Sequence, residues 1–306
     1  MDILIFVISM SALIYGADFI IEQSEKIALH FNISPFVIGA TLIALGTSLP
    51  EMAVSMSASL KGSGDIAVAN VIGSTIFNIS LVLGFVFLIA KKIEPKRDLF
   101  AKDSSWSLFP ILIFILMGLD GKLSRLDGFL FLMLMGAYLL FLIQSNQVDE
   151  ANQDDDKEKF AWGKTLSLLL IGFIFVVGGA DFAIDSAGNI ARSFGVSEWI
   201  VGLFLVAFGT SLPELVVSIQ AARNNNADMA IGAIIGSNVA NFTMVLGISS
   251  LVNPLNVNLN ATFFDVMAAL IVSVMLVFIT ANKLYNKSAG IVMMTVLALV
   301  ISNSFY

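Results

Sequence analysis

One long internal repeat restricts the fold of this chain more than any other feature of its sequence. The string ALGTSLPE at residues 44–51 returns as AFGTSLPE at residues 207–214. Equivalent residues of the two copies lie 163 positions apart, and the spacing holds without a gap from residue 16 to residue 84. The chain is therefore built from two related halves. The matching pairs are Gly16 and Gly179, Gly39 and Gly202, Glu51 and Glu214, Gly73 and Gly236, Asn78 and Asn241, and Gly84 and Gly247.

The composition places both halves in a membrane. Hydrophobic residues make up 58% of the 306 residues and charged residues only 13%, whereas a soluble domain carries roughly 25% charged residues. Apolar runs of about 18 residues or more are typical of spanning helices. The pattern predicts ten spans, near residues 2–21, 36–60, 66–90, 106–119, 127–144, 163–190, 199–222, 229–252, 262–281 and 288–305.

Five spans in each half is an odd number, so the second half must sit upside down relative to the first. Inverted repeats of this kind are typical of secondary transporters, which hold their substrate near the middle of the membrane. We therefore predict an all-α integral membrane protein with ten transmembrane helices in two inverted five-helix repeats. The repeats would cover residues 1–144 and 163–306, with a polar acidic linker at 145–162.

The charges suggest an orientation and exclude some partners. Most of the 16 Lys and Arg residues fall in loops that share one side if the N-terminus lies outside. The positive-inside rule then predicts a protein of the cell membrane with both termini outside and the linker in the cytoplasm. We read the first apolar run as a mature helix, because MDILIF lacks a basic region. The net charge of −7 argues against nucleic acid as a partner. We expect the monomer to be functional.

The repeated GTSLPE motif puts polar groups where a membrane helix needs apolar ones. Pro50 has no N–H, so the carbonyl of Gly46 loses its helical partner. Irregular backbone at membrane depth is tolerated where it lines a cavity, which predicts a discontinuous helix at each motif. Thr47, Ser48 and Glu51 lie three or four residues apart and share one helix face. The second copy repeats the arrangement with Pro213, Gly209, Thr210, Ser211 and Glu214.

A second polar pair follows each motif. GSTIFN places Ser74 and Asn78 four residues apart, and GSNVAN does the same for Ser237 and Asn241. Together the halves would surround two carboxylates with hydroxyl, amide and carbonyl oxygens, which suits hard cations such as Ca²⁺ and Na⁺. The chain has no Cys and a single His, so a soft-metal site is disfavoured. Ser55 and Ser218 are better explained by helix packing, but an ionisable residue at the centre of a membrane helix is usually functional.

The doubled GTSLPE and GSxxxN motifs resemble the alpha repeats of sodium/calcium exchangers and of their prokaryotic calcium/sodium antiporter relatives. The resemblance implies Ca²⁺/Na⁺ antiport by alternating access, in which the first and sixth helices slide against the rest. It implies that Glu51 and Glu214 bind Ca²⁺ and Na⁺ in turn, that Asn78 and Asn241 close the site, and that no cofactor or enzyme activity is involved. The remaining implied ligands are Thr47, Ser48, Ser74, Thr210, Ser211, Ser237 and the backbone oxygens of Ala44 and Ala207.

The chain also departs from the family pattern. Many prokaryotic relatives carry Asp where this chain has Asn241, and the potassium-dependent branch resembles them, so Asn241 implies potassium independence. Ala233 stands where the first half has Asn70, and we assign no ion role to Asn70. Asp18 and Asp181 lie near helix ends, where structural roles are expected. Two other functions stay open: a proton/Ca²⁺ exchanger on the same scaffold, and a cation channel. An intramembrane enzyme is disfavoured, because no nucleophile–base pair is visible.

Overall fold

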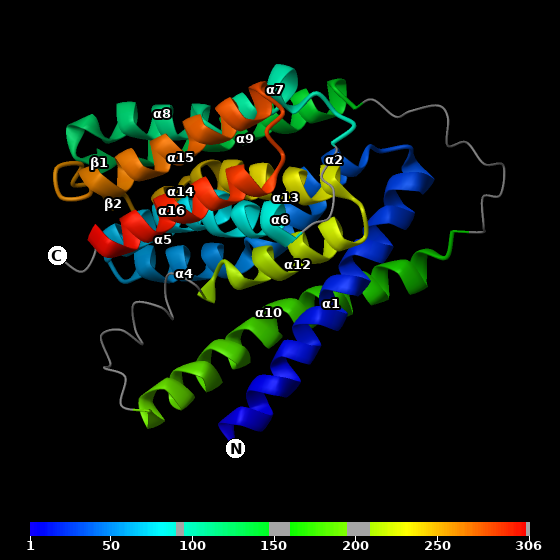
Figure 1. The fold of residues 1–306 in the computed structure, drawn as a ribbon. Coiled ribbons are helices and arrows are strands. Elements are labelled where there is room, and N and C mark those ends of the chain that lie inside the picture. The colour runs from blue at the N-terminus through cyan, green and yellow to red at the C-terminus, as the bar shows by residue number, and fades with distance from the viewer. Residues whose placement is uncertain (90–94, 147–159, 195–208, 304–306) are drawn as a thin grey trace.

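The computed structural model describes residues 1–89, 95–146, 160–194 and 209–303. Its first half contains one long helix, a broken one and several shorter ones (Figure 1). Most of the linker and much of the predicted seventh span, including Gly202 and Ala207, lie outside the described residues. The first-half elements are α1 (Asp2–Phe31), α2 (Pro35–Ile38), η1 (Gly39–Ile43), α3 (Ala44–Thr47), α4 (Leu49–Leu60), α5 (Gly64–Phe77), η2 (Asn78–Leu83), α6 (Gly84–Ile89), α7 (Leu99–Lys102), η3 (Ser104–Ser107), α8 (Phe109–Met117), η4 (Gly118–Asp120), β1 (Lys122–Leu123) and α9 (Arg125–Gln144).

The second half repeats part of this order of elements. The helices around its two motifs begin and end 163 residues after their counterparts, as α4 and α12 or α5 and α13 show. Three π-helical turns are described, and two of them, η2 and η6, begin at the repeated asparagines, Asn78 and Asn241. The second-half elements are α10 (Trp162–Ser193), α12 (Leu212–Arg223), α13 (Ala227–Ala240), η6 (Asn241–Val245), α14 (Leu246–Val252), β2 (Leu255–Asn256), α15 (Phe263–Ala281) and α16 (Lys287–Asn303).

Local sequence signals explain where several helices begin and end. Ser34 accepts a hydrogen bond from the N–H of Val37, and Pro35 occupies the first turn of α2. Ser124 and Asp127 form a capping box at the start of α9. Helix α1 ends at Phe31, and the capping residue Asn32 adopts the left-handed conformation at φ 57°. The predicted end of this helix at residue 21 was ten residues too early, because the polar stretch after it continues the helix.

Six of the described helices are long and apolar enough to cross a membrane. The number rises to seven if α2–α3 and α4, which meet at a bend of 45°, count as one broken span. Two shorter apolar stretches, Ser104–Asp120 and Lys287–Asn303, occupy the predicted fourth and tenth spans. The protein is thus a multi-pass helical membrane protein, and the full count of ten stays a prediction.

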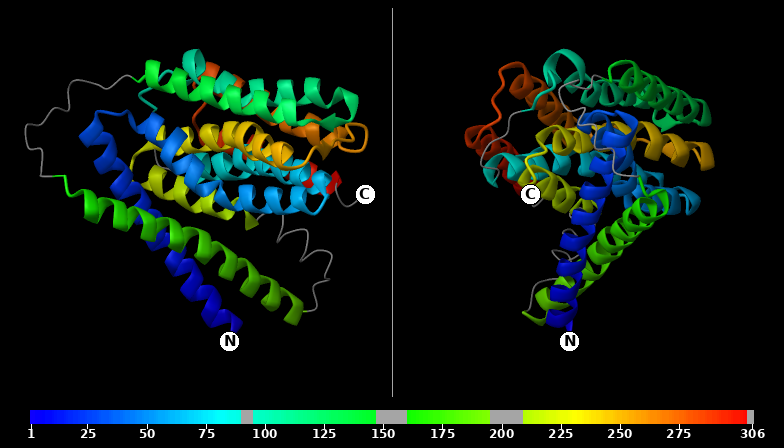
Figure 2. Two further views of the ribbon diagram at one scale, coloured as in Figure 1. Left: turned by 180° about the vertical axis from the view of Figure 1, so that it is seen from behind. Right: turned by 90° about the vertical axis from the view of Figure 1, so that its right-hand side faces the viewer.

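The helices stack in layers, and the repeated motifs lie in the middle ones (Figures 1 and 2). Helices α8, α9 and α15 form one outer layer, while α5, α13 and α14 fill the centre with α4 and α12 beneath them. The pair α1 and α10 crosses on the opposite side. This crossing is close, since a Cβ on Gly16 would lie 2.8 Å from the carbonyl oxygen of Gly172. The strands β1 and β2 add one short antiparallel pair.

Candidate ion-binding site

The first motif forms a broken helix in the centre of the bundle. Helix α3 ends at Thr47 and α4 begins at Leu49, with Ser48 between them at φ −83° and ψ 7°. The hydroxyl of Thr47 donates to the carbonyl oxygens of Ile43 at 3.2 Å and Ala44 at 3.3 Å. Glu51 follows in the first turn of α4. The break predicted from Pro50 is therefore present, and it leaves hydroxyl and carbonyl oxygens beside a carboxylate.

The second motif has the same local form in the residues that are described. Ser211 precedes α12 at φ −89° and ψ 0°, which is close to the conformation of Ser48, and Pro213 lies in the first turn. Glu214 follows in that turn. The hydroxyls of Thr210 and Ser211 are buried and have no hydrogen-bond partner within the described residues. The second half thus presents, beside its carboxylate, two hydroxyl groups without a hydrogen-bond partner among the described residues.

Hydrogen bonds join the two motifs to one another. Ser48 Oγ donates to Glu214 Oε1 at 3.4 Å, so the serine of one half contacts the carboxylate of the other. Ser74 Oγ donates to Glu51 Oε1 at 3.4 Å within the first half. Ser237 Oγ donates to the carbonyl oxygen of Ala44 at 3.4 Å, again between the halves. Residues 166 and 193 positions apart therefore share one polar cluster.

Among the described residues, no Lys or Arg side chain pairs with the two carboxyl groups of the cluster. Glu51 and Glu214 are 0% and 2% exposed. Neither forms an ion pair with a described Lys or Arg, and the Oε2 atom of each has no hydrogen-bond partner within the described residues. A buried carboxylate without a partner is costly, so such a site favours either protons or metal cations. The described residues hold no group of three or more His, Cys, Asp or Glu side chains that could bind a metal, so neutral oxygens would have to complete a coordination shell.

Asparagines supply further oxygen atoms at the π-helical turns η2 and η6. Asn78 and Asn241 are both fully buried. Asn78 Nδ2 donates to Asn238 Oδ1 at 3.1 Å, which leaves Asn78 Oδ1 without a partner, and neither side-chain polar atom of Asn241 has one within the described residues. Short π-helical segments inside α-helices occur frequently at functional sites. Both amides can offer a neutral oxygen to a cation.

Of the twelve predicted site residues, only Ala207 falls outside the described residues. Two asparagines without a predicted role, Asn70 and Asn238, form hydrogen bonds with predicted site residues. Asn70 Nδ2 donates to the backbone oxygen of Glu51 at 3.2 Å and to Ser55 Oγ at 3.0 Å. Asn238 contacts Asn78, as described above. The second motif did contain the signal for Asn238, because GSNVAN has an amide where GSTIFN has Thr75.

Two residues set aside in the sequence have structural contacts. Ser55 accepts the hydrogen bond from Asn70 and faces the packed interior, as expected for a packing residue. Asp18 accepts a hydrogen bond from Gln220, which connects α1 to α12. Neither contact involves the two buried glutamates.

Comparison with known proteins identifies a family to which the chain is similar. The model of the family described as sodium/calcium exchanger protein matches residues 1–144 and 164–306. An uncharacterised membrane protein of Methanocaldococcus jannaschii, MJ0091, is 41% identical over 80% of this chain and 80% of its own length. The sodium/calcium exchanger MaX1 of Methanosarcina acetivorans is 30% identical over 96% of this chain and 95% of its own.

A solved structure agrees with these sequence matches. The sodium–calcium exchanger NCX_Mj, soaked with zero Na⁺ and Ca²⁺, is 35% identical and superposes with a TM-score of 0.83. The alignment covers 99% of this chain and 98% of that chain. The repeated motifs, the buried glutamates and these matches lead to one conclusion: the chain belongs to the sodium/calcium exchanger family.

Proposed function

We propose that the protein is a secondary antiporter that exchanges Ca²⁺ for Na⁺ across the membrane by alternating access. The observation that carries the proposal is the pair of buried glutamates, one from each half, joined through Ser48. Two ionised carboxylates would give a site of charge −2, which one Ca²⁺ neutralises. Membership of the exchanger family supports the same reading.

The proposed ligands come in matched sets from the two halves. Glu51 and Glu214 bind Ca²⁺ and Na⁺ in turn, and Asn78 and Asn241 close the site. Ca²⁺ takes about six to eight oxygen ligands and accepts flexible geometry, so two carboxylates and several neutral oxygens suffice. The hydroxyls and carbonyls that complete the Na⁺ shells are those of Thr47, Ser48, Ser74, Thr210, Ser211 and Ser237, and the backbone oxygens of Ala44 and Ala207.

The proposed architecture has ten spans in two inverted repeats, covering residues 1–144 and 163–306 and joined by a cytoplasmic linker at 145–162. The equal spacing of element bounds in the two halves supports the duplication. Alternating access would move α1 and α10 against the remaining helices, and their close crossing at Gly16 and Gly172 supports movement as a pair. Both termini would face the outside of the cell membrane, and the monomer would be the transporting unit.

The experiment that tests the function is ⁴⁵Ca²⁺ uptake into proteoliposomes with imposed gradients. An outward Na⁺ gradient should drive uptake, whereas H⁺ and K⁺ gradients of the same size should not. Ca²⁺ flux that depends on pH but not on Na⁺ would instead indicate a proton/Ca²⁺ exchanger. Ca²⁺ flux that needs no counter-ion on the opposite side would indicate a channel.

We also propose that the exchange carries net charge and is independent of K⁺. If three Na⁺ replace one Ca²⁺, the ratio implied by the family resemblance, each cycle moves one positive charge. A potential of about 100 mV then contributes roughly 2.3 kcal/mol per cycle. Clamping the potential with valinomycin should change the Na⁺-dependent flux, and replacing K⁺ by choline on both sides in unclamped vesicles should not. A flux that ignores the clamped potential would rule out net charge movement.

A further inference from the structure

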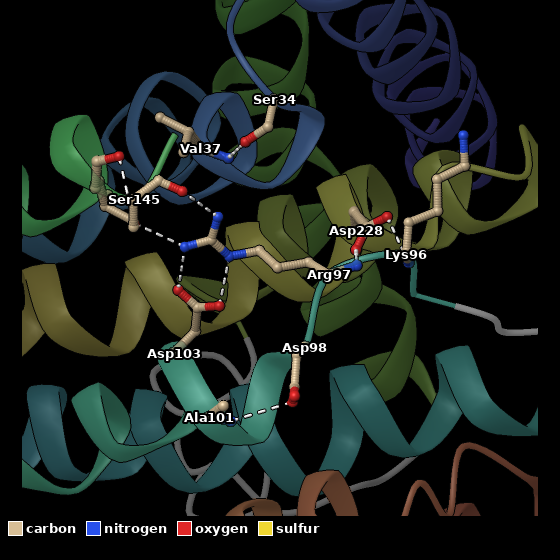
Figure 3. A network of polar contacts seen from close by, with 10 residues as sticks. Ser34, Val37, Lys96, Arg97, Asp98, Ala101, Asp103, Ser145 and Asp228 are labelled. Atoms are coloured by element: carbon tan, nitrogen blue, oxygen red, sulfur yellow. Dashed lines mark hydrogen bonds and ion pairs between the residues drawn. The ribbon is translucent and has the colours of Figure 1, made fainter. Parts of the chain in front are cut away.

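A buried arginine ties together several helix ends at one end of the bundle (Figure 3). The guanidinium of Arg97 donates from Nε to Asp103 Oδ2 at 2.6 Å and from Nη2 to Asp103 Oδ1 at 2.9 Å. Nη1 and Nη2 also donate to the carbonyl and hydroxyl oxygens of Ser145 at 2.9 and 2.8 Å. The Arg97 and Asp103 side chains are only 7% and 0% exposed. This network, which we call the Arg97 clasp, joins the loop before α7 to the end of α9.

The clasp also reaches the first turns of two helices that lead to the ion-binding site. The Arg97 guanidinium carbon lies 4.7 Å from the centre of the Phe36 ring, in α2. The backbone N–H groups of Lys96 and Arg97 donate to the carboxylate of Asp228, in α13, at 3.0 and 3.2 Å. The Arg97 side chain thus contacts the start of α2, while the backbone of residues 96–97 binds the start of α13.

From the clasp onward, α2 with η1 and α13 run in backbone contact. A Cβ added to Gly232 would collide with the carbonyl oxygen of Phe36, and one added to Gly236 with that of Ala40. Conversely, a Cβ on Gly39, in η1, would collide with the carbonyl oxygen of Met229, in α13. Contacts of this kind leave no room for a side chain, so a slide of one helix along the other would disturb all of them together.

The far end of this helix pair is the ion-binding site. There Ser237 Oγ in α13 donates to the carbonyl oxygen of Ala44 in α3. Thr47 and Ser48 lie three and four residues after Ala44 in the first half, and Ser48 contacts Glu214. A continuous path of contacts thus connects the Arg97 clasp, the glycine contacts and the proposed Na⁺ ligands.

We propose that Arg97 is a positioning residue that sets the register of α2 and η1 against α13 and so places the Ala44 carbonyl and Ser237 hydroxyl for Na⁺. The inference rests on the proposed function. A buried ion pair is weak evidence for stability, and its best-attested use is to fix the register of packed elements. Arginine suits that task because its planar fork binds a carboxylate in two places and stacks on an aromatic ring, which lysine cannot reproduce.

The test compares Na⁺ affinity in Arg97→Lys, Ser145→Ala and a control, Ser124→Ala. Ser124 caps the opposite end of α9, so its loss lowers stability without touching the α2–α13 pair. The readout is the Na⁺ concentration that gives half of the maximal Na⁺-induced thermal shift of the purified protein. Arg97→Lys should raise that concentration by about threefold to tenfold, because the second carboxylate contact and the ring stacking are lost. Ser145→Ala should raise it less, and Ser124→Ala should leave it unchanged while lowering the melting temperature.

A second measurement reads the helix register without ions. The chain has no cysteine, so spin labels can be placed on cysteines introduced at the exposed Pro35, which begins α2, and at the half-buried Ala227, which begins α13. Arg97→Lys should shift or broaden the distance distribution between the labels, and Ser124→Ala should not. An unchanged Na⁺ affinity in Arg97→Lys, or in Ser145→Ala if the lysine variant fails to fold, would overturn the proposal. A wild type that shows no Na⁺ response would instead refute the proposed function, and the label distances would still decide the role of Arg97.

Discussion

The two halves of the protein supply the same ion-facing groups but support them differently. Each half places a glutamate after a proline break and an asparagine at the start of a π-helical turn. In the first half, Asn70 holds the backbone oxygen of Glu51 and the hydroxyl of Ser55. In the second half Ala233 replaces that amide. The duplicated residues are those proposed to touch the ions, whereas the residues behind them have diverged.

The support of the asparagines also differs between the halves, and here the second half has the additional amide. Asn238 accepts a hydrogen bond from Asn78, and so the second half orients an amide of the first. Its counterpart in the first half, Thr75, instead donates to the backbone oxygen of Val71 within its own helix. We infer that the ion-binding groups must be symmetric for one site to serve both faces of the membrane, while their supports need only fill the space available.

The largest expected effect follows from the symmetric part of the comparison. Glu51→Gln and Glu214→Gln should each abolish Ca²⁺ transport without unfolding the protein, because glutamine keeps the shape and removes the charge. ⁴⁵Ca²⁺ uptake into proteoliposomes measures this. The matched control is Glu22→Gln, whose side chain is 57% exposed and pairs with Lys26, and it should transport normally. Transport near the wild-type rate in one of the two site variants would mean that this glutamate is not a ligand.

Asn241→Asp sharpens the comparison by making the halves unequal in charge. Three crowded carboxylates resist full ionisation, so one of them should take up a proton unless another cation binds. The variant should remain active, but its Ca²⁺ flux should become sensitive to pH or to K⁺. Flux measured over a range of pH, and with K⁺ replaced by choline, checks this. If neither sensitivity appears, Asn241 does not face the ion.

Asn70→Ala would remove the support that only the first half has. Its amide is the donor in two buried hydrogen bonds, and a loss of this kind costs about 1–3 kcal/mol. We expect a lower thermal unfolding midpoint in detergent, together with weaker Ca²⁺ binding. A midpoint and an affinity equal to those of the wild type would show that the first half needs this amide no more than the second half does.

The smallest effect concerns the serines one turn beyond each glutamate. Ser55 has a partner in Asn70, but Ser218 Oγ is buried without one in the described part of the chain. Ser218→Ala should change the free energy of unfolding by less than about 0.5 kcal/mol, or stabilise the protein slightly, because no hydrogen bond is lost. Ser55→Ala should destabilise it by about 1 kcal/mol. Equal effects on the unfolding midpoint would contradict the asymmetry.

Much of the candidate site could be predicted from sequence, because the polar GTSLPE motif occurs once in each half. The repeated proline indicates a break, and the residue spacing places Thr47, Ser48 and Glu51 on one face. The sequence also predicts that the halves meet around two carboxylates, and the contact between Ser48 and Glu214 is one place where they do. The contact between Asn78 and Asn238 did not follow, because it depends on the rotation of one half against the other, which no residue pattern records.

The Arg97 clasp could not be predicted for a related reason. Its partners, Phe36, Asp103, Ser145 and Asp228, come from separate elements and have no common spacing. Only the packing of the chain brings them together. The end of α1 was also missed, because hydropathy marks where a helix leaves the apolar layer and not where its hydrogen bonds stop. Helix α1 continues through charged residues to Phe31.

The central claim is that the two glutamates form one shared site, and counting bound Ca²⁺ tests it most directly. Equilibrium binding of ⁴⁵Ca²⁺ to purified protein should give one ion per chain in the wild type. At concentrations that saturate the wild type, Glu51→Gln and Glu214→Gln should each bind almost none, and the double variant should be no worse than either. Two ions per wild-type chain, or single variants that each retain one tightly bound ion, would mean that each half holds its own site and would contradict the account.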